Sequence, residues 1–329
     1  MVLSITKEEA NKIKNEVDLI KKEISKVFIG QREIIDGFIT CLLSNGSVLI
    51  EGVPGLGKTL LARTIAKVLG VQFSRIQFTP DLLPTDIIGI TTYEEGRGFY
   101  VLKGPIFANI VLADEINRAP PKVQSALLEA MQEKQATISK ETFELPKPFF
   151  VLATENPLES LGTYPLPDAQ LDRFLFKIFI GYPSLEEERR ILDTNITSKK
   201  FEDYDLKAVS SADRILELQE KLKNVFVDEK IKEYIVKIVD ATRNPDKYKL
   251  KLGKYIQYGA SPRASIAFYL SSKVDAVTVF GKNYVTPYNV KRVAKHILNH
   301  RVAVNFEGET NNISSFDIIE EIITKIPVP

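Results

Sequence analysis

The sequence contains one cysteine and two histidines among its 329 residues. A single cysteine, Cys41, excludes an internal disulfide, and with only two histidines it cannot complete a zinc site. His296 and His300 stand four residues apart on an expected helix, a spacing that can bind a metal. No glutamate follows His296 to make the metalloprotease motif, so we expect both to be ordinary helix residues.

Excess charge and long apolar runs are also absent. Lys and Arg total 44 against 43 Asp and Glu, which gives no electrostatic reason to expect nucleic acid or a membrane as a partner. No apolar run approaches transmembrane length, and Lys and Glu stand where a signal peptide would be hydrophobic. We therefore expect a cytoplasmic protein. The Lys-rich stretch 244–255 could contact nucleic acid, but a solvated loop is the simpler interpretation.

What the sequence does have is a series of short apolar segments that alternate with helical patterns. Helical periodicity covers residues 7–26 and 33–43. Several of the segments that follow are continuously apolar, as expected for strands covered on both faces. The five candidate strands lie in VLIEG, FSRIQF, NIVLADE, PFFVLATEN and FKIFIGYP. Strands that alternate with helices predict a parallel α/β sheet.

Two stretches interrupt this alternation, and the strand signals end at Pro183. Residues 89–107 and 136–148 each have the pattern of a β-hairpin with a polar tip, which predicts two insertions on the α/β frame. The later helical patterns cover 185–195, 211–223, 228–243, 262–280 and 287–302. We therefore predict an α/β domain at 1–183, whose residues 1–26 form an N-terminal helix, and a small all-helical domain at 184–329.

The segment GVPGLGKT, residues 52–59, fits the phosphate-binding pattern G-x-x-x-x-G-K-[ST]. It follows an apolar strand and opens a helix, which is the context that the pattern requires. Its glycines let backbone N–H groups converge on an anion, and the helix start adds further donors. Lys58 would be misplaced at the positive end of this helix unless phosphates lie beside it. Thr59 would hold Mg²⁺ through its hydroxyl.

Polar residues end two further apolar strands. Asp114 and Glu115 come at the end of a buried strand, where ligands bind in open α/β folds. Asp114 would serve the metal, directly or in its second shell, and Glu115 could polarise an attacking water as a general base. Adjacent carboxylates favour hydrolysis over transfer to another acceptor. Asn156, in VLATENP, could orient the water or touch the γ-phosphate, although a simple turn before Pro157 also explains it.

Two arginines remain as candidates. Ser261 has the character of an N-cap and Pro262 of a first helical residue, so Arg263 is a cation at the positive end of a helix. Such a cation indicates a nearby anion. Arg173 lies near the end of a short helix, where cations are favoured in any case, so charge alone favours a structural role for it.

Four stretches in this order resemble the MoxR family of AAA+ ATPases: GVPGLGKT, LADEINRAPPKVQSALLEAMQE, GTYPLPDAQLDRF and YGASPRA. The resemblance extends over about residues 23–301. It implies a P-loop AAA+ parallel-sheet core with a helical lid, and ATP bound between core and lid and between the subunits of a ring. The two hairpins match the helix-2 insert and the pre-sensor-1 hairpin of that clade.

The resemblance also implies roles for individual residues. Asn156 corresponds to sensor 1, Arg173 to the arginine finger and Arg263 to sensor 2, while Glu155 stands where the family often has Gln. The implied nucleotide-binding residues are Ile29, Gly30 and Gln31 for adenine, and Gly52, Pro54, Gly55, Leu56, Gly57, Lys58, Thr59 and Leu60 for the phosphates. The implied cofactors are ATP and Mg²⁺, with Thr59 and Asp114 at the metal.

Two classes of function remain open. One is an ATP-driven, chaperone-like remodeller of protein clients, working as a homo-oligomer, expected to be a nucleotide-dependent hexameric ring, with a von Willebrand factor A domain protein as partner. The alternative is a DNA-translocating motor or helicase component of the same hairpin-bearing clade. A hairpin that grips phosphates should carry net positive charge, whereas these tips combine Glu94 and Glu95 with Arg97, and Lys140 with Glu141 and Glu144. The charge pattern favours the remodeller.

Overall fold

The computed structural model describes residues 4–96, 98–156, 162–194 and 201–329. At its centre is a five-stranded sheet with the order β2-β5-β8-β1-β9, in which all neighbouring strands are parallel. Its strands are β1 (Val48–Glu51), β2 (Phe73–Gln77), β5 (Ile110–Asp114), β8 (Phe150–Glu155) and β9 (Phe176–Phe179). These are the five predicted strands, and the predicted parallel α/β sheet is confirmed.

The sheet separates two apolar cores, because successive side chains of a strand point to opposite faces. Val48 and Ile50 of β1 pack with helices α1 (Lys7–Ile24), α2 (Arg32–Leu43) and α3 (Lys58–Leu69). Leu49 points the other way, into the core formed with α5 (Pro121–Glu133) and the short α4 (Pro84–Ile88). Both faces are therefore covered, which explains why the strands are continuously apolar.

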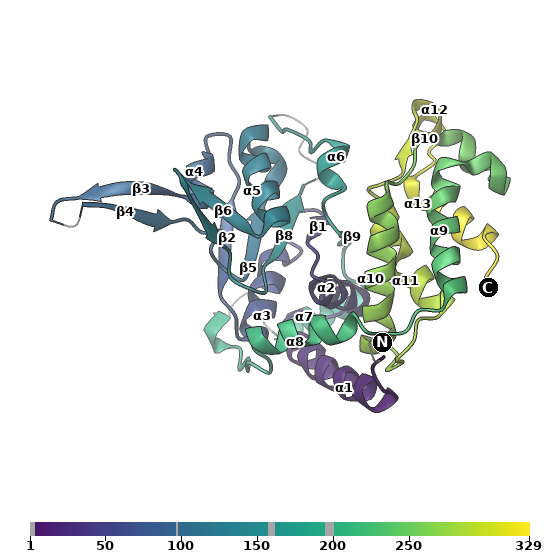
Figure 1. The fold of residues 1–329 in the computed structure, drawn as a ribbon, viewed down its shortest axis with the longest axis horizontal. Helices are drawn as coiled ribbons and strands as arrows, with labels where there is room; N and C mark the ends of the chain where they lie inside the picture. The colour runs from purple at the N-terminus through teal and green to yellow at the C-terminus, as the bar shows by residue number, and fades with distance from the viewer. Residues whose placement is uncertain (1–3, 97, 157–161, 195–200) are drawn as a thin grey trace.

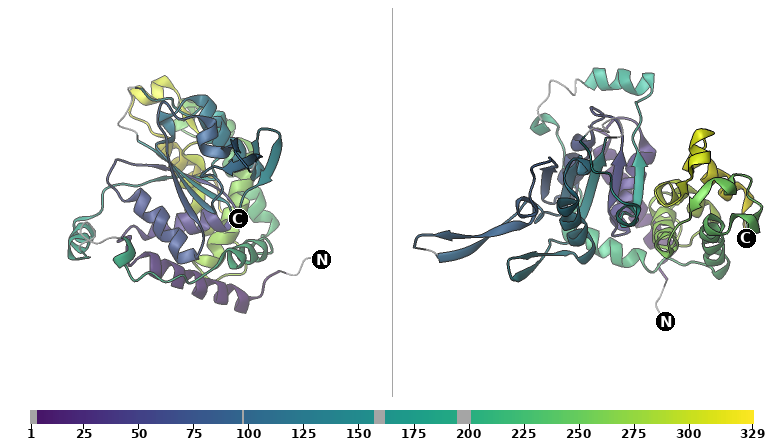
Figure 2. Two further views of the ribbon diagram at one scale, coloured as in Figure 1. Left: turned by 90° about the vertical axis from the view of Figure 1, so that its left-hand side faces the viewer. Right: turned by 90° about the horizontal axis from the view of Figure 1, so that it is seen from above.

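Both predicted hairpins are present. The first consists of β3 (Gly89–Glu94) and β4 (Gly98–Lys103), and the second of β6 (Gln135–Ile138) and β7 (Glu141–Glu144). The hairpin β3–β4 extends farthest from the body of the molecule (Figures 1 and 2). The hydroxyls of Thr91, on β3, and Ser139, in the turn between β6 and β7, form a hydrogen bond of 2.9 Å that joins the two hairpins.

The C-terminal part is mainly helical, as predicted, and its portion from α9 (Glu229–Arg243) onward forms a lid beside the sheet domain (Figure 1). Five helices match the predicted ones: α7 (Leu185–Thr194), α8 (Ala212–Leu222), α9 (Glu229–Arg243), α10 (Pro262–Thr278) and α11 (Pro287–Leu298). The sequence analysis did not predict α12 (Phe306–Thr310), α13 (Ser315–Lys325) or a small sheet of β10 (Ile256–Tyr258) and β11 (Ala303–Val304). The lid is therefore not entirely helical.

Short turns complete the chain. They are η1 (Ile116–Arg118), α6 (Asp168–Leu171), η2 (Phe201–Asp203), η3 (Pro245–Tyr248) and η4 (Leu252–Tyr255). The Lys-rich stretch contains η3 and η4, and Lys247 within it pairs with Asp240 at 2.7 Å. None of the helices in the described part of the chain is both long and apolar enough to cross a membrane.

The N-terminal helices bind the two parts of the chain together. Helix α8, which we placed in the second domain, lies against α2, since Gln219 Nε2 donates to Leu42 O at 2.7 Å. On α1, Lys21 pairs with Asp36 at 2.7 Å, and Asp36 pairs in turn with Arg292 of α11 at 3.3 Å. The lid is thus fixed to the sheet domain through α1 and α2.

Candidate active site

The phosphate loop, residues 52–59, connects β1 to α3 in a conformation that depends on glycine. Gly57 caps α3 with a positive φ of 75°, a region that side chains with a Cβ rarely adopt. A Cβ on Gly52 would lie 2.7 Å from Ile180 O, so no larger residue fits there without movement. The loop therefore leads into the exposed N–H groups at the start of α3, which form an anion-binding site.

Lys58 crosses this loop. Its Nζ donates to Gly52 O at 2.5 Å, so the ammonium group closes the loop on itself. Burial lowers the pKa of Lys58, while the nearby carboxylates of Asp114, Glu115 and Glu51 act to raise it. The cation is therefore held between a backbone carbonyl and acidic groups, with the donors of α3 beside it.

The acid pair, Asp114 and Glu115, lies at the carboxyl end of β5. Asp114 is buried, and its Oδ2 accepts from Arg75 Nη2 at 2.6 Å. Glu115 adopts a left-handed backbone conformation with φ of 58°, which is strained for a residue with a side chain. Gln77 Nε2 at 2.8 Å and Arg118 Nη1 at 3.0 Å both donate to Oε2 of Glu115.

Thr154 connects the two acids, and sequence reasoning missed it. Its hydroxyl donates to Asp114 Oδ1 at 2.7 Å and accepts from the Glu115 backbone N–H at 2.8 Å. Arg75 and Gln77 were missed as well. Their positions depend on the strand register: Gln77 is paired with Asp114, and Thr154 follows Ala153, which is paired with Ala113, so both lie beside the acid pair.

Asn156 lies at the same edge of the sheet. It follows β8 directly and is 4% exposed. Because Glu51 is paired with Glu155, the next residues, Gly52 and Asn156, lie side by side. The phosphate loop, the acid pair and Asn156 are therefore together at the carboxyl edge of the sheet, as predicted. Pro157, which belongs to the same motif, is outside the described residues.

Glu155, which stands where the family often has Gln, is a buried carboxyl group with a second acid, Glu51, beside it. Burial raises the pKa of its carboxyl group; Lys177 opposes this rise and Glu51 adds to it. Lys177 forms an ion pair with Glu51 at 2.6 Å. The three groups form one charge cluster beneath the phosphate loop, on the face of the sheet away from α3.

Arg173 and Arg263 lie at the amino ends of the strands, opposite the carboxyl ends that carry the phosphate loop. Arg173 precedes β9, and the nearby Leu175 N–H bonds to Ser47 O, just before β1 begins. Arg263 Nη1 lies 3.3 Å from Asp172 Oδ2 at this same edge. The four residues of β1 separate this edge from the phosphate loop by roughly 13 Å at about 3.3 Å per residue.

Arg263, the expected sensor 2, lies in the lid at the amino end of the strands, away from the phosphate loop of its own chain. The anion that its helix position indicated is the Asp172 carboxylate of the same chain. The side chain of Arg263 is still 48% exposed, and Arg173 is exposed too, with Nη1 donating to Gln132 Oε1 at 2.7 Å.

The predicted adenine-binding residues border a cavity of about 730 Å³. Gly30 and Gln31 line it together with Tyr182 and the first turn of α7, while Ile29 is buried behind them. Glu187 of α7 accepts from the Gln31 backbone N–H at 2.9 Å, and Gln31 Nε2 donates to Gly181 O at 3.0 Å. The cavity thus has polar groups at fixed positions.

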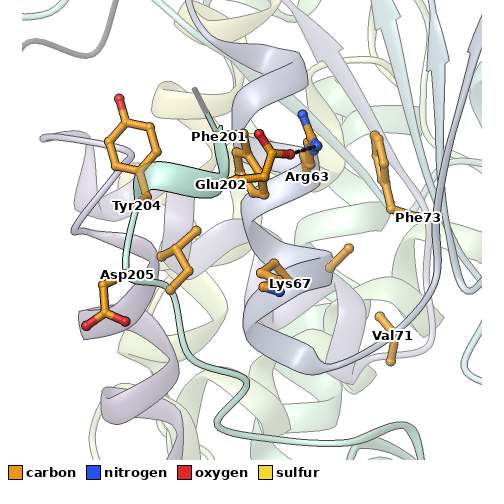
Figure 3. Close-up of a pocket in the computed structure, with 10 residues that line it drawn as sticks. Arg63, Lys67, Val71, Phe73, Phe201, Glu202, Tyr204 and Asp205 are labelled. Atoms are coloured by element: carbon orange, nitrogen blue, oxygen red, sulfur yellow. Dashed lines mark hydrogen bonds and ion pairs between the residues drawn. The ribbon is translucent and has the colours of Figure 1, made fainter. Parts of the chain in front are cut away.

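A second cavity, of about 570 Å³, lies beside the C-terminal half of α3 (Figure 3). Arg63 and Lys67 line it from α3, facing residues 201–206. Arg63 stacks on Phe201, with Cζ 4.1 Å from the ring centroid, and pairs with Glu202 at 2.7 Å. None of the predicted site residues lines this cavity.

The structure also bears on metal binding. No group of three or more His, Cys, Asp and Glu residues comes together anywhere in the described ranges. A magnesium ion that is held mainly by phosphates and waters needs fewer protein ligands. Thr59, in the first turn of α3, and Asp114 fit this chemistry. Both oxygens of Asp114 already accept protein hydrogen bonds, which suits contact through a metal-bound water.

The two histidines are structural, as predicted, although α11 ends at Leu298, before His300. Burial lowers the pKa of His296 to about 4, and its ring lies 5.5 Å from that of Phe176. Burial also lowers the pKa of His300, whose Nε2 is 3.2 Å from Phe174 O. Both side chains belong to the contact between lid and sheet.

Comparison with known proteins gives consistent matches. Residues 47–176 match the family described as "ATPase family associated with various cellular activities (AAA)", and residues 252–322 match the AAA lid domain. Chaperone MoxR1 of Mycobacterium tuberculosis is 45% identical over 310 residues, covering 93% of this chain and 81% of that protein. The uncharacterised YeaC of Bacillus subtilis is 44% identical over 309 residues, covering 94% and 93%.

A solved structure is similar over nearly its full length. A crystal structure from Cytophaga hutchinsonii, described as a candidate ATPase, is 44% identical to this chain with a TM-score of 0.91. The match covers 98% of this chain and 97% of the other. The sheet, the hairpins and the lid are therefore shared with a protein whose structure is known.

Proposed function

Since this chain belongs to the MoxR family of AAA+ ATPases, it is an ATP-hydrolysing enzyme, and we propose that it works as an oligomeric ring that remodels protein clients. In this proposal the α/β domain at 1–183 binds the nucleotide and residues 184–329 form the lid. Each active site combines the phosphate loop of one subunit with the arginines of its neighbour.

The residues at the carboxyl edge of the sheet have separate tasks. Backbone N–H groups of residues 52–59 cradle the phosphates, and Lys58 exchanges its bond to Gly52 O for a phosphate oxygen. Thr59 and Asp114 would hold Mg²⁺, which would supply positive charge at the phosphate oxygens. Further predicted residues shape the loop around the phosphates: Pro54, Gly55, Leu56 and Leu60. Adenine is bound in the neighbouring cavity by Ile29, Gly30 and Gln31.

Glu115 acts as the general base. Its Oε2 is held by Gln77 and Arg118, so Oε1 is the oxygen placed to accept a proton from the attacking water. Thr154 fixes the Glu115 backbone, and Asn156, beside Gly52, orients the water or the γ-phosphate. The strained backbone of Glu115 is consistent with a conformation that function requires.

The observation that carries the ring proposal is the position of Arg173 and Arg263. Both are catalytic in the proposal, yet they lie at the sheet edge opposite their own phosphate loop. A second subunit resolves this difficulty, because its phosphate loop can meet the exposed arginines of the first. An arginine supplied in this way accelerates phosphoryl transfer by about 10³- to 10⁵-fold.

Mixing two inactive variants tests this proposal. Arg173→Ala should abolish hydrolysis but leave nucleotide binding largely intact, and Lys58→Ala should lose binding. Random mixing at equal amounts should restore activity, up to about one quarter of the wild-type rate per chain, because about one interface in four joins an intact loop to an intact arginine. If the mixture stays inactive while mixed rings form, or if Arg173→Ala turns over at the wild-type rate, the proposal is wrong.

The longer hairpin supports a protein client rather than nucleic acid. Tyr93 and Phe99 are 63% and 79% exposed and form an edge-to-face pair at 5.2 Å. On the other face of the hairpin, Ile90 and Leu102 are also exposed. Exposed apolar side chains on a projecting element suit an unfolded or loosely folded polypeptide. A von Willebrand factor A domain protein as partner, and a cytoplasmic location, complete the proposal.

Substituting the aromatic pair tests the client part of the proposal. We expect Tyr93→Ser combined with Phe99→Ser to weaken binding of labelled casein, a polypeptide that lacks a stable fold, at least tenfold, without changing basal ATP hydrolysis by more than twofold. Leu19→Ser, which removes a similarly exposed apolar side chain on α1, is the control. Binding of duplex or single-stranded DNA that depends on the hairpin would instead favour the motor.

A further inference from the structure

Of the two catalytic arginines of the proposed function, Arg263 contacts the carboxylate of Asp172, the residue that directly precedes Arg173 in the chain. The Oδ2 of Asp172 faces the start of lid helix α10. Ser261, the N-cap of that helix, donates its hydroxyl proton to Asp172 Oδ2 at 2.8 Å. Arg263 Nη1 approaches the same oxygen at 3.3 Å. We call residues 172–175, which include Arg173, the finger loop. The Asp172 side chain thus connects the finger loop to the helix that carries Arg263.

Asp172 is itself fixed by a buried arginine. The side chain of Arg301 is 3% exposed, and its Nε donates to Asp172 Oδ1 at 2.7 Å. Its Nη2 donates to the carbonyl oxygens of Asp172 at 3.2 Å and Phe174 at 2.6 Å. Its Nη1 donates to Leu175 O at 3.2 Å and to Ile297 O at 2.6 Å.

All five donors of the Arg301 guanidinium are thereby used, and four of the bonds hold residues 172–175, which surround Arg173. A buried charge with this number of bonds to one turn has few alternative arrangements. The turn that carries Arg173 cannot shift without breaking these bonds, and α10 cannot shift without breaking those of Asp172.

We propose that Asp172 and Arg301 are positioning residues that hold Arg173 and Arg263 as one unit, so that both reach the nucleotide of the neighbouring subunit together. This inference rests on the proposed ring arrangement. Neither residue needs to touch the nucleotide. Asp172 transmits the position of the lid helix to the finger loop, and Arg301 keeps Asp172 and the loop in register with the end of α11.

The test is Asp172→Asn in the full-length chain, which keeps the shape of the side chain but removes its charge. We expect kcat for ATP to fall at least tenfold and KM to change less than threefold, because the variant's own phosphate loop is untouched. Asp240→Asn is the matched control, since it removes a carboxylate that pairs with Lys247 in the lid, away from Asp172. Its kcat should stay within twofold of wild type.

Mixing then separates a positioning role from a damaged fold. Lys58→Ala subunits have an intact Asp172, so they should restore activity when combined with Asp172→Asn subunits. A kcat within twofold of wild type for Asp172→Asn, or a loss that Lys58→Ala subunits do not restore, would overturn the inference. If Arg173→Ala is rescued by Lys58→Ala subunits while Asp172→Asn is not, the ring arrangement stands and only this inference fails.

A second variant covers the case in which Asp172→Asn does not fold. Ser261→Gly removes the hydroxyl that bonds to Asp172, and glycine is well tolerated at an N-cap. We expect kcat to fall at least threefold with the same rescue by Lys58→Ala subunits. An unchanged kcat for Ser261→Gly would count against the connection between α10 and the finger loop.

Discussion

Replacing Thr154 with valine should remove the hydroxyl that holds Asp114 and Glu115, with little change in the shape of the side chain. Valine has nearly the volume of threonine, and Thr154 is completely buried on β8, so the substitution removes the hydroxyl without opening a cavity. Two hydrogen bonds are lost: the one donated to Asp114 Oδ1 at 2.7 Å and the one accepted from the Glu115 N–H at 2.8 Å.

The magnitude follows from these two bonds. A hydrogen bond to a charged group contributes about 1.5–3 kcal/mol, and a buried donor left unpaired costs about 1–3 kcal/mol. Asp114 retains its bonds to Arg75, and the Glu115 site is only partly buried, so we expect a loss in the lower half of the sum, about 2.5–4 kcal/mol. ATP turnover should fall about tenfold or more, because Glu115 loses the bond that fixes its backbone.

Thr64 provides the matched control. It is also completely buried, on α3, but its hydroxyl has no hydrogen-bond partner among the residues that the structure describes. Thr64→Val should therefore be neutral or slightly stabilising, by up to about 1 kcal/mol. The assay is thermal unfolding of both variants, alongside steady-state ATP hydrolysis. An unfolding temperature for Thr154→Val within error of wild type, or an equal drop for both variants, would show that the Thr154 hydroxyl does not stabilise the acid pair.

Two further predictions concern catalysis and pH. Glu115→Gln should bind ATP without cleaving it and should stabilise the assembled ring, as measured by single-turnover hydrolysis and sedimentation; rapid turnover by this variant would contradict the role of Glu115 as base. Burial holds the pKa of His296 at about 4, against about 6.5 in the unfolded chain. Between about pH 4 and pH 6.5, therefore, the unfolded state binds a proton at this residue that the folded state does not bind. The free energy of unfolding should therefore fall as pH drops from about 6.5 to 4, by at most about 3 kcal/mol from this residue. His296→Gln should reduce that slope in urea titrations at pH 5 and 7.5, leaving the share of His300; an unchanged slope would contradict the assignment.

The strands and most of the site could be predicted because their signals are local. An apolar run followed by Gly52 and Lys58 specifies a strand, a loop and a helix within a few residues. Asp114, Glu115 and Asn156 all follow apolar strands, and parallel strands bring their carboxyl ends to one edge. No knowledge of the strand order was needed to place these residues together.

The supporting residues could not be predicted in the same way. Arg75, Gln77 and Thr154 support the acid pair only because β2 and β8 are the neighbours of β5, and that order is not written in any one segment. The last helix is a different case: Ser314 and Asp317 form a capping box at its start, a local signal that the sequence analysis overlooked.

The location of Arg263 is also a tertiary property. Its place at a helix start correctly indicated an anion, but the sequence could not tell a phosphate from the Asp172 carboxylate, which is 91 residues away in the chain. Only the position of the lid reveals that Arg263 and Arg173 share one edge of the sheet. This shared position is the basis for an active site between subunits.

The most direct test of that active site is the rate of ATP hydrolysis per chain as a function of protein concentration, with the assembly state followed by sedimentation on the same samples. If Arg173 and Arg263 act on a neighbouring subunit, the rate per chain should rise steeply as rings form and then reach a plateau. A rate that stays appreciable and constant down to dilutions at which the protein is monomeric would contradict the account, because a single chain would then hydrolyse ATP without arginines from a neighbour.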